Sequence, residues 1–171
     1  MFGKKFLSLR TKSILKKNKI IRASTSFNNA KNIGIIFSSD DKFKFDCIKQ
    51  FKKDLENEGK TVVVLSYLGK GKENHEFLFD FFTSKDISFW GRFTSSLVND
   101  FIAQPFDFVF SVDTKSNIYT DNILACSQAK CRVGIFSENK SRFFELMINI
   151  NDSKPINALI HDMYHFTKKL N

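Results

Sequence analysis

Short apolar runs alternate with helical patterns along most of the chain. Between the runs, apolar residues recur at intervals of three and four, which is typical of one face of an α-helix. The runs are rich in β-branched and aromatic residues, as expected for strands that helices cover on both faces. The predicted strands span residues 32–37, 61–67, 106–112, 131–136 and 143–150. We therefore predict an α/β fold, a three-layer Rossmann-like domain with a mostly parallel sheet.

The first strand ends abruptly in two serines and two aspartates. Ser38 or Ser39 is predicted to cap the next helix, with Asp40 and Asp41 in its first turn, where the helix dipole favours negative charge. Gly59 is predicted to end this helix in a left-handed conformation. The apolar stripe of the helix is expected to consist of Phe43, Cys47, Ile48, Phe51 and Leu55. The other predicted helices cover residues 95–104 and 117–127 and a final segment that Ser153 caps, with Pro155 in its first turn.

Residues 76–93 are dense in aromatic side chains and hold the single tryptophan, Trp90. Their period is ambiguous, although Phe77, Phe79 and Phe81 alternate as in a strand. Rings beside Arg92 and Lys85 are an arrangement that stacks unpaired bases in single-strand binders. Packing in the core or at a sheet edge is the favoured interpretation, because the 21 phenylalanines must build the core.

Positive charge is concentrated at the N-terminus. Residues 1–39 contain nine lysines and arginines and no carboxylate, whereas the remainder carries 18 basic and 18 acidic residues. The formal net charge of +9 therefore belongs to the leading segment, and a partner with phosphates is the natural candidate. The predicted nucleic-acid-binding residues are Lys4, Lys5, Arg10, Lys12, Lys16, Lys17, Lys19 and Arg22.

The same segment has the pattern of a basic amphipathic helix. One half of its helical wheel carries apolar residues and the other half carries most of the cations. Such a helix can lie on an anionic membrane, follow a nucleic-acid backbone, or pack on its own domain with its lysines in water. The apolar half consists of Phe2, Phe6, Leu7, Leu9, Ile14, Ile20 and Ile21. Residues 24–29 read as a polar linker, so we predict an arm and linker over 1–30 and one α/β domain over 31–171.

A second set of polar residues is predicted to lie at the carboxyl ends of the strands, where open α/β sheets place ligands. Asp113 follows the strand over 106–112, and Lys70 and Lys72 lie in the Gly-Lys-Gly-Lys turn after the second strand. With Asp40 and Asp41 they form a candidate cleft. A turn or capping role is the favoured interpretation for Asp113, and a solvated loop is the favoured one for the basic turn, which lacks the spacing of a P-loop.

Other chemistry has little support in the sequence. His161 and His165 are spaced to share a metal on one helix face, but no cysteine or glutamate motif accompanies them, so we expect no metal and no cofactor. No serine has the sequence context of a nucleophile elbow, so the sequence gives no support for a hydrolase mechanism. Three cysteines and the absence of a long apolar run favour a cytoplasmic protein.

Two resemblances involve the predicted strands. The runs FLFDFFTSKD, QPFDFVFSVD, AKCRVGIF and FFELMI resemble an uncharacterised family of small bacterial α/β proteins, which implies the fold but no activity. Residues 106–134 are similar to the N-terminal half of heptosyltransferase-like glycosyltransferases, with Gln128 in place of the usual glycine. Those enzymes hold the sugar nucleotide with a second domain, for which this chain has no residues left.

Three functions remain open at this point. The leading hypothesis is a non-enzymatic protein that its basic arm anchors to RNA, within a ribosomal or other ribonucleoprotein assembly. The alternatives are a peripheral membrane-surface protein that uses the same helix, and a degenerate glycosyltransferase-like or nucleotide-binding domain.

Overall fold

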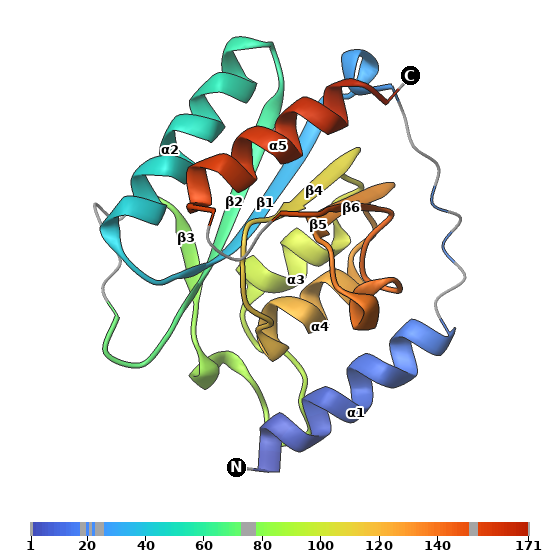
Figure 1. Ribbon diagram of the computed structural model, residues 1–171. Helices are drawn as coiled ribbons and strands as arrows, with labels where there is room; N and C mark the ends of the chain where they lie inside the picture. Colours follow the sequence, from blue (N-terminus) through green and yellow to red (C-terminus); the bar gives the residue numbers. More distant parts are fainter. Residues whose placement is uncertain are drawn as a thin grey trace.

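The computed structural model describes residues 2–17, 20, 22, 26–72, 78–150 and 154–170. Its centre is a six-stranded sheet in the order β3-β2-β1-β4-β5-β6, and all five strand pairings are parallel (Figure 1). The strands are β1 (Asn32–Ser39), β2 (Thr61–Leu68), β3 (Asp80–Phe82), β4 (Phe108–Ser111), β5 (Cys131–Ile135) and β6 (Leu146–Ile148). The predicted parallel sheet is confirmed.

Helices cover both faces of this sheet. Helices α2 and α5 lie on one face and α3 and α4 on the other, while α1 packs outside α4 as an additional layer (Figure 1). The helices are α1 (Phe2–Lys17), α2 (Lys42–Asn57), α3 (Ser96–Ala103), α4 (Ile118–Cys126) and α5 (Ile156–Lys168). The three-layer α/β fold and the N-terminal helix are therefore both present.

The strand order is that of a doubly wound sheet. Strands β2 and β3 are added on one side of β1, and β4, β5 and β6 are added on its other side. The register pairs Ile36 of β1 with Ser111, the last residue of β4, and β1 continues beyond this pair to Ser39. A ligand in such a fold sits outside the carboxyl ends of the strands where the strand order reverses, between β1 and β4. We call this place the switch point.

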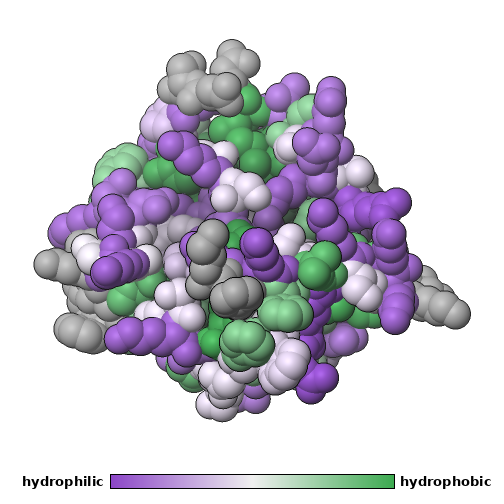
Figure 2. Space-filling view, turned by 90° about the horizontal axis from the view of Figure 1, so that it is seen from below, coloured by the Kyte–Doolittle hydropathy of each residue, from purple (hydrophilic) through white to green (hydrophobic). Residues whose placement is uncertain are grey.

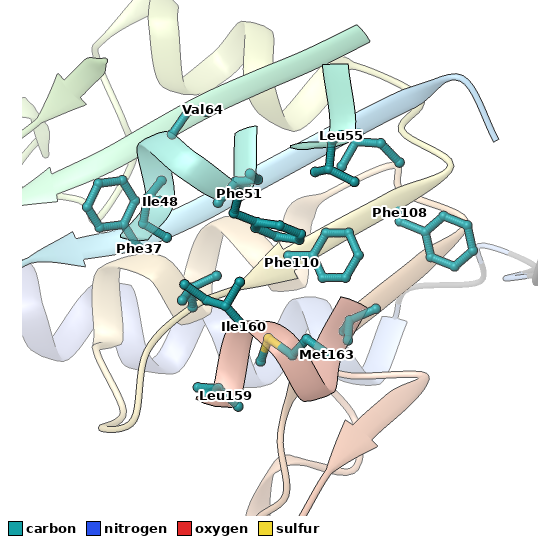
Figure 3. Close-up of a cluster of buried hydrophobic side chains, with 14 of the residues drawn as sticks. Phe37, Ile48, Phe51, Leu55, Val64, Phe108, Phe110, Leu159, Ile160 and Met163 are labelled. Atoms are coloured by element: carbon teal, nitrogen blue, oxygen red, sulfur yellow. The ribbon is translucent and has the colours of Figure 1, made fainter. Parts of the chain in front are cut away.

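Aromatic rings fill the core between the sheet and helices α2 and α5 (Figure 3). Phe51 of α2 meets Phe110 of β4 with ring centroids 5.2 Å apart and planes at 80°, an edge-to-face contact. Leu159 and Met163 of α5 are completely buried against the same sheet face. The prediction that phenylalanine builds the core is confirmed here.

The N-cap of α2 lies two or three residues later than predicted. Ser38 and Ser39 remain in β1, and Asp41 is the capping residue, because its side chain accepts a hydrogen bond of 2.8 Å from the Lys44 amide. The buried stripe consequently begins at Lys44 and Phe45, and Phe43 is 57% exposed. Gly59 ends the turn after α2 with φ +77°, as predicted.

The final helix begins at Ile156, with Pro155 as its N-cap instead of a residue of its first turn. The predicted cap, Ser153, lies outside the described residues. Proline suits this position because it has no amide hydrogen that would need a partner.

Part of the predicted linker belongs to the core. Phe27, in a short 3-10 helix η1 (Phe27–Asn29), is 1% exposed and packs against Phe108 and Tyr164. The Lys60 ammonium donates hydrogen bonds of 2.8 Å to the Phe27 and Ala30 carbonyls, which fixes this turn to the start of β2. Because residues 24–29 are otherwise polar, their composition did not indicate that Phe27 is buried in the core.

The aromatic segment forms the edge of the sheet. Strand β3 lies at one edge of the sheet, in agreement with the predicted core or edge packing of this stretch. Phe79 and Phe82 are buried and Phe81 is 38% exposed, so Phe79 and Phe81 do not share one face as the alternation suggested; Phe77 lies outside the described residues. After the 3-10 helix η3 (Ser84–Asp86), the chain turns at Phe89 and Trp90, which are both exposed. The core interpretation therefore does not extend to the tryptophan, which is 69% exposed.

Candidate functional site

At the switch point, a buried ion pair joins the end of β4 to the start of α2. The Lys44 ammonium lies 2.6 Å from the Asp113 carboxylate, and both side chains are less than a tenth exposed. Ser38 donates to the same carboxylate through its amide (2.8 Å) and its hydroxyl (3.0 Å). Asn117, the cap of α4, donates to the Ser38 hydroxyl at 2.9 Å. These contacts satisfy the Asp113 side chain from within the chain.

The predicted cleft residues meet here only in part. Asp40 forms a second ion pair with Lys44 at 2.9 Å, and Lys72 donates to the Asp40 carbonyl at 2.8 Å. Asp41 is occupied in capping α2, and Lys70 is exposed in the turn. Asp40, Asp113 and Lys72 thus converge around a lysine that the predicted cleft did not include.

The resulting network is poorly suited to acid–base or ribose-binding chemistry. Burial raises the pKa of Asp113, and the Lys44 ammonium and the Ser38 donors oppose that rise. A catalytic or ribose-binding carboxylate must have oxygens free to face a ligand, whereas this one already accepts three hydrogen bonds. Asp113 borders a hollow of about 240 Å³, which the ion-paired Asp121 and Lys140 also line.

Lys44 is absent from the predicted cleft, because the predicted apolar stripe of this helix began at Phe43. A signal was present, since residues 44, 48, 51 and 55 have helical spacing and place a lysine at the first position of the buried stripe. A lysine in such a position almost always has a buried partner. The nearest strand-end carboxylate would then have been Asp113.

The N-terminal helix is docked on α4 and on the turn at Gly91. Leu7 is completely buried, and the Thr11 hydroxyl, itself buried, accepts a hydrogen bond of 2.7 Å from Asn122 of α4. Gly91 approaches the backbone of α1 so closely that an added Cβ would lie 2.6 Å from the Leu7 nitrogen. The apolar half of the predicted wheel is only partly buried, because Leu9 is 63% exposed.

Most cations of α1 are exposed to solvent. In the described part of the chain, none of its exposed lysines forms a salt bridge; Lys4 alone lies 5.6 Å from an aromatic ring centroid, that of Tyr119. The exposed lysines are Lys4, Lys5, Lys12, Lys16 and Lys17, and Arg10 is partly exposed. Lys19 lies outside the described residues.

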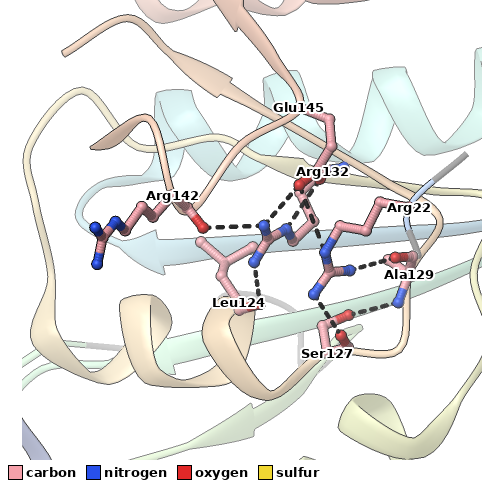
Figure 4. A network of polar contacts seen from close by, with 7 residues as sticks. All are labelled: Arg22, Leu124, Ser127, Ala129, Arg132, Arg142 and Glu145. Carbon is pink, nitrogen blue, oxygen red and sulfur yellow. Dashed lines mark hydrogen bonds and ion pairs between the residues drawn. The ribbon is translucent and has the colours of Figure 1, made fainter. Parts of the chain in front are cut away.

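Arg22 is an exception among the predicted nucleic-acid-binding residues (Figure 4). Its guanidinium donates to the carbonyls of Ala129 and Ser127 at the C-terminal end of α4, and its side chain is 9% exposed. The Arg22 Nε atom also lies 3.5 Å from Oε1 of Glu145. Both carboxylate oxygens of Glu145 accept hydrogen bonds from Arg132. We therefore remove Arg22 from the set, because this cation neutralises a helix terminus and a carboxylate of its own domain.

On one side of α1, aromatic rings and arginines surround an open hollow of about 600 Å³. Phe6 lies with its ring centroid 5.8 Å from the centroids of both Phe89 and Trp90. The hollow is lined by Phe6, Leu9, Arg10, Ser13, Trp90 and Arg92. Figure 2 views the molecule from below Figure 1 and shows hydrophilic side chains around small hydrophobic patches. Sequence reasoning treated the arm and the tryptophan segment separately, but the structure brings them together.

Metal-binding residues are not clustered in the described ranges. His161 and His165 stack with ring centroids 6.0 Å apart, and no group of three potential ligands forms there. The third histidine of the chain, His75, lies outside those ranges. Among the helices that the structure describes, none has the length and apolar character needed to cross a membrane.

The model of DUF6913, a family of unknown function, matches residues 4–170. The chain belongs to this family. Because the match includes nearly all of α1, the basic helix is part of the DUF6913 domain. Searches of the curated proteins and of the solved structures gave no significant match.

Proposed function

We propose that this DUF6913 protein is a non-enzymatic RNA-binding module of a ribonucleoprotein assembly, and that the docked α1 presents its cations to the phosphate backbone. The observation that carries the proposal is the outward row of lysines on α1, which form no salt bridge in the described part of the chain. Elsewhere, many cations already face carboxylates, as Lys44, Lys130 and Lys140 do. Helix α1 contains no carboxylate, so its positive charge is not balanced within the helix.

Docking makes this surface better suited to a polyanion than a free arm would be. Helix α1 has 16 residues and is about 24 Å long, so its lysines span several phosphates. Leu7 and Thr11 hold the helix in place before any partner binds. Less ordering entropy is then lost on association than with a disordered arm.

The switch point supports a binding role over catalysis. At the place where a doubly wound sheet would bind a nucleotide, Lys44 and Asp113 satisfy each other. A sugar nucleotide would have to displace this buried pair and leave its charges unpaired. The glycosyltransferase-like alternative has no comparable support.

The proposal is tested by recovering the tagged protein from cells with and without nuclease treatment. We expect RNA to be recovered with the wild-type protein and lost after nuclease. Replacing Lys5, Lys12 and Lys16 with glutamine is expected to lower the recovered RNA several-fold, because three phosphate contacts disappear.

A matched control removes the same number of charges from the opposite side of the sheet, by replacing Lys49, Lys53 and Lys169 with glutamine. All three are exposed on α2 or at the end of α5. Equal RNA recovery with both triple variants would contradict the proposal. Recovery of anionic lipid without RNA would instead favour the membrane alternative.

A further inference from the structure

We infer that the hollow beside Trp90 binds unpaired bases, so that the RNA partner is single-stranded where it crosses α1. This inference rests on the proposed function and names its substrate class. It comes from two segments that are 80 residues apart in the sequence and meet in space: the start of α1 and the turn after η3.

The rings in this hollow are exposed to a degree that is unusual for large aromatic side chains in contact with one another. Trp90, which lines the hollow, is 69% exposed, and Phe89, which lies next to the hollow, is 58% exposed; their ring centroids lie 5.3 Å apart. Phe6 contacts both rings and is 36% exposed. Stacking on an aromatic platform is tolerant of base identity, because each base offers a π-face. The cluster is therefore a suitable base platform that is already assembled.

Arginine accompanies the rings on both sides of the hollow. Arg10 comes from α1 and Arg92 from the turn, and within the described residues neither forms a salt bridge. A guanidinium binds phosphate oxygens with two parallel hydrogen bonds and also stacks on bases. The lysines of α1 continue the positive charge beyond the hollow. Rings in the centre with cations around them match a strand whose bases turn inward and whose phosphates lie outside.

The shape and the charge favour single-stranded RNA over its two competitors. In a duplex the bases are stacked on each other, and their faces are not available to Trp90. A membrane-inserting surface would be apolar throughout, whereas two arginines lie beside these rings. Duplex RNA would contact the lysines alone and would leave the rings unused.

The test compares binding of a labelled single-stranded RNA with binding of a duplex of the same sequence and length, measured by fluorescence anisotropy at one salt concentration. Trp90 is the single tryptophan, so its intrinsic emission reports on the hollow directly. We expect tighter binding of the single strand and quenching of Trp90 emission by the single strand. The variant Trp90→Ala should weaken single-strand binding about tenfold and leave duplex binding unchanged.

Two further variants make the result specific. Trp90→Phe keeps a stacking ring and should restore most of the single-strand affinity. Phe166→Ala removes an aromatic ring of 45% exposure on α5, on the opposite sheet face, and should have no effect. Circular dichroism of each variant checks that the fold is retained, as expected for side chains so exposed.

The outcomes separate the two proposals. Equal affinity for single strand and duplex, with no effect of Trp90→Ala, would overturn this inference and leave RNA binding intact. Failure of both RNAs to bind would overturn both proposals. A blue shift of Trp90 emission on anionic vesicles, without any response to RNA, would overturn both in favour of a membrane surface.

Discussion

Replacing Lys44 with methionine removes the ammonium group that faces the buried carboxylate of Asp113. The methionine keeps an unbranched apolar stem of similar length, so packing changes little. Asp113 retains its two donors from Ser38 but loses its cationic partner. We expect the Lys44–Asp113 pair to stabilise the fold, so the variant should be strongly destabilised.

The size of the expected stability loss follows from the burial of both Lys44 and Asp113. Breaking a buried ion pair by removing one member costs about 3–5 kcal/mol, because the remaining charge stays in a poorly solvated place. Asp40, the other partner of Lys44, has a side chain that is 59% exposed and contributes little to this loss. Lys44→Met combined with Asp113→Asn removes both charges, so the double variant should be more stable than the sum of the single losses implies, with a coupling of about 2 kcal/mol.

Urea unfolding followed by circular dichroism measures these values at pH 7. In Lys44→Met, Asp113 loses the cation that opposes the rise in its pKa, so that pKa rises further. An acid with a raised folded pKa stabilises the protein at low pH, and this stability is lost as pH rises through the folded pKa. The defect of the variant should thus be smaller at pH 5 than at pH 8. A loss below about 1 kcal/mol, or strict additivity in the double variant, would refute the reasoning.

Three further predictions concern other parts of the structure. Gly91→Ala places a Cβ against the Leu7 backbone and should increase amide hydrogen exchange in α1. The control variant Gly59→Ala has a similar positive φ but open space around it, so the amides of α1 should stay protected from exchange. Asp107 accepts hydrogen bonds from the Lys31 and Asn32 amides and from the Lys130 ammonium, and Asp107→Asn should destabilise the protein by about 1–3 kcal/mol at pH 7. Burial raises the pKa of Asp107, but these donors lower it by more, so the stability difference from wild type should narrow as pH falls below about 4, which acid titration followed by circular dichroism measures. Arg22→Gln should lower the midpoint of urea unfolding without changing RNA affinity, and a large loss of affinity would return this residue to the binding surface.

Much of the fold could be predicted because its signals are local. Strand-length apolar runs and helical stripes identified five of the six strands and all of the helices, and the crossover from residues 32–37 to 61–67 implied a parallel pair. The helix starts were less predictable, since several serines and aspartates compete for each cap. At α2 the choice between Ser39 and Asp41 decided which side chain entered the core, and Lys44 took the place expected for Phe43.

The candidate site was harder to predict because it depends on contacts between distant segments. The charge of the arm was evident from the sequence, but its docking depends on Gly91 and Asn122, which no pattern within residues 1–22 reveals. Arg22 has the same charge as its neighbours and yet is buried against α4. Only the three-dimensional arrangement separates a cation that binds its own domain from one that faces outward.

The salt dependence of single-stranded RNA affinity tests the central claim most directly, when it is measured on the wild type and on the two triple lysine variants. For single strands, the logarithm of the affinity falls with the logarithm of the salt concentration, by about 0.7 for each phosphate neutralised. Replacing Lys5, Lys12 and Lys16 should therefore reduce the slope by about 2, and the variant with three changes on the opposite side should keep the wild-type slope. Equal slopes for all three proteins would contradict the account, because α1 would then contact no phosphates.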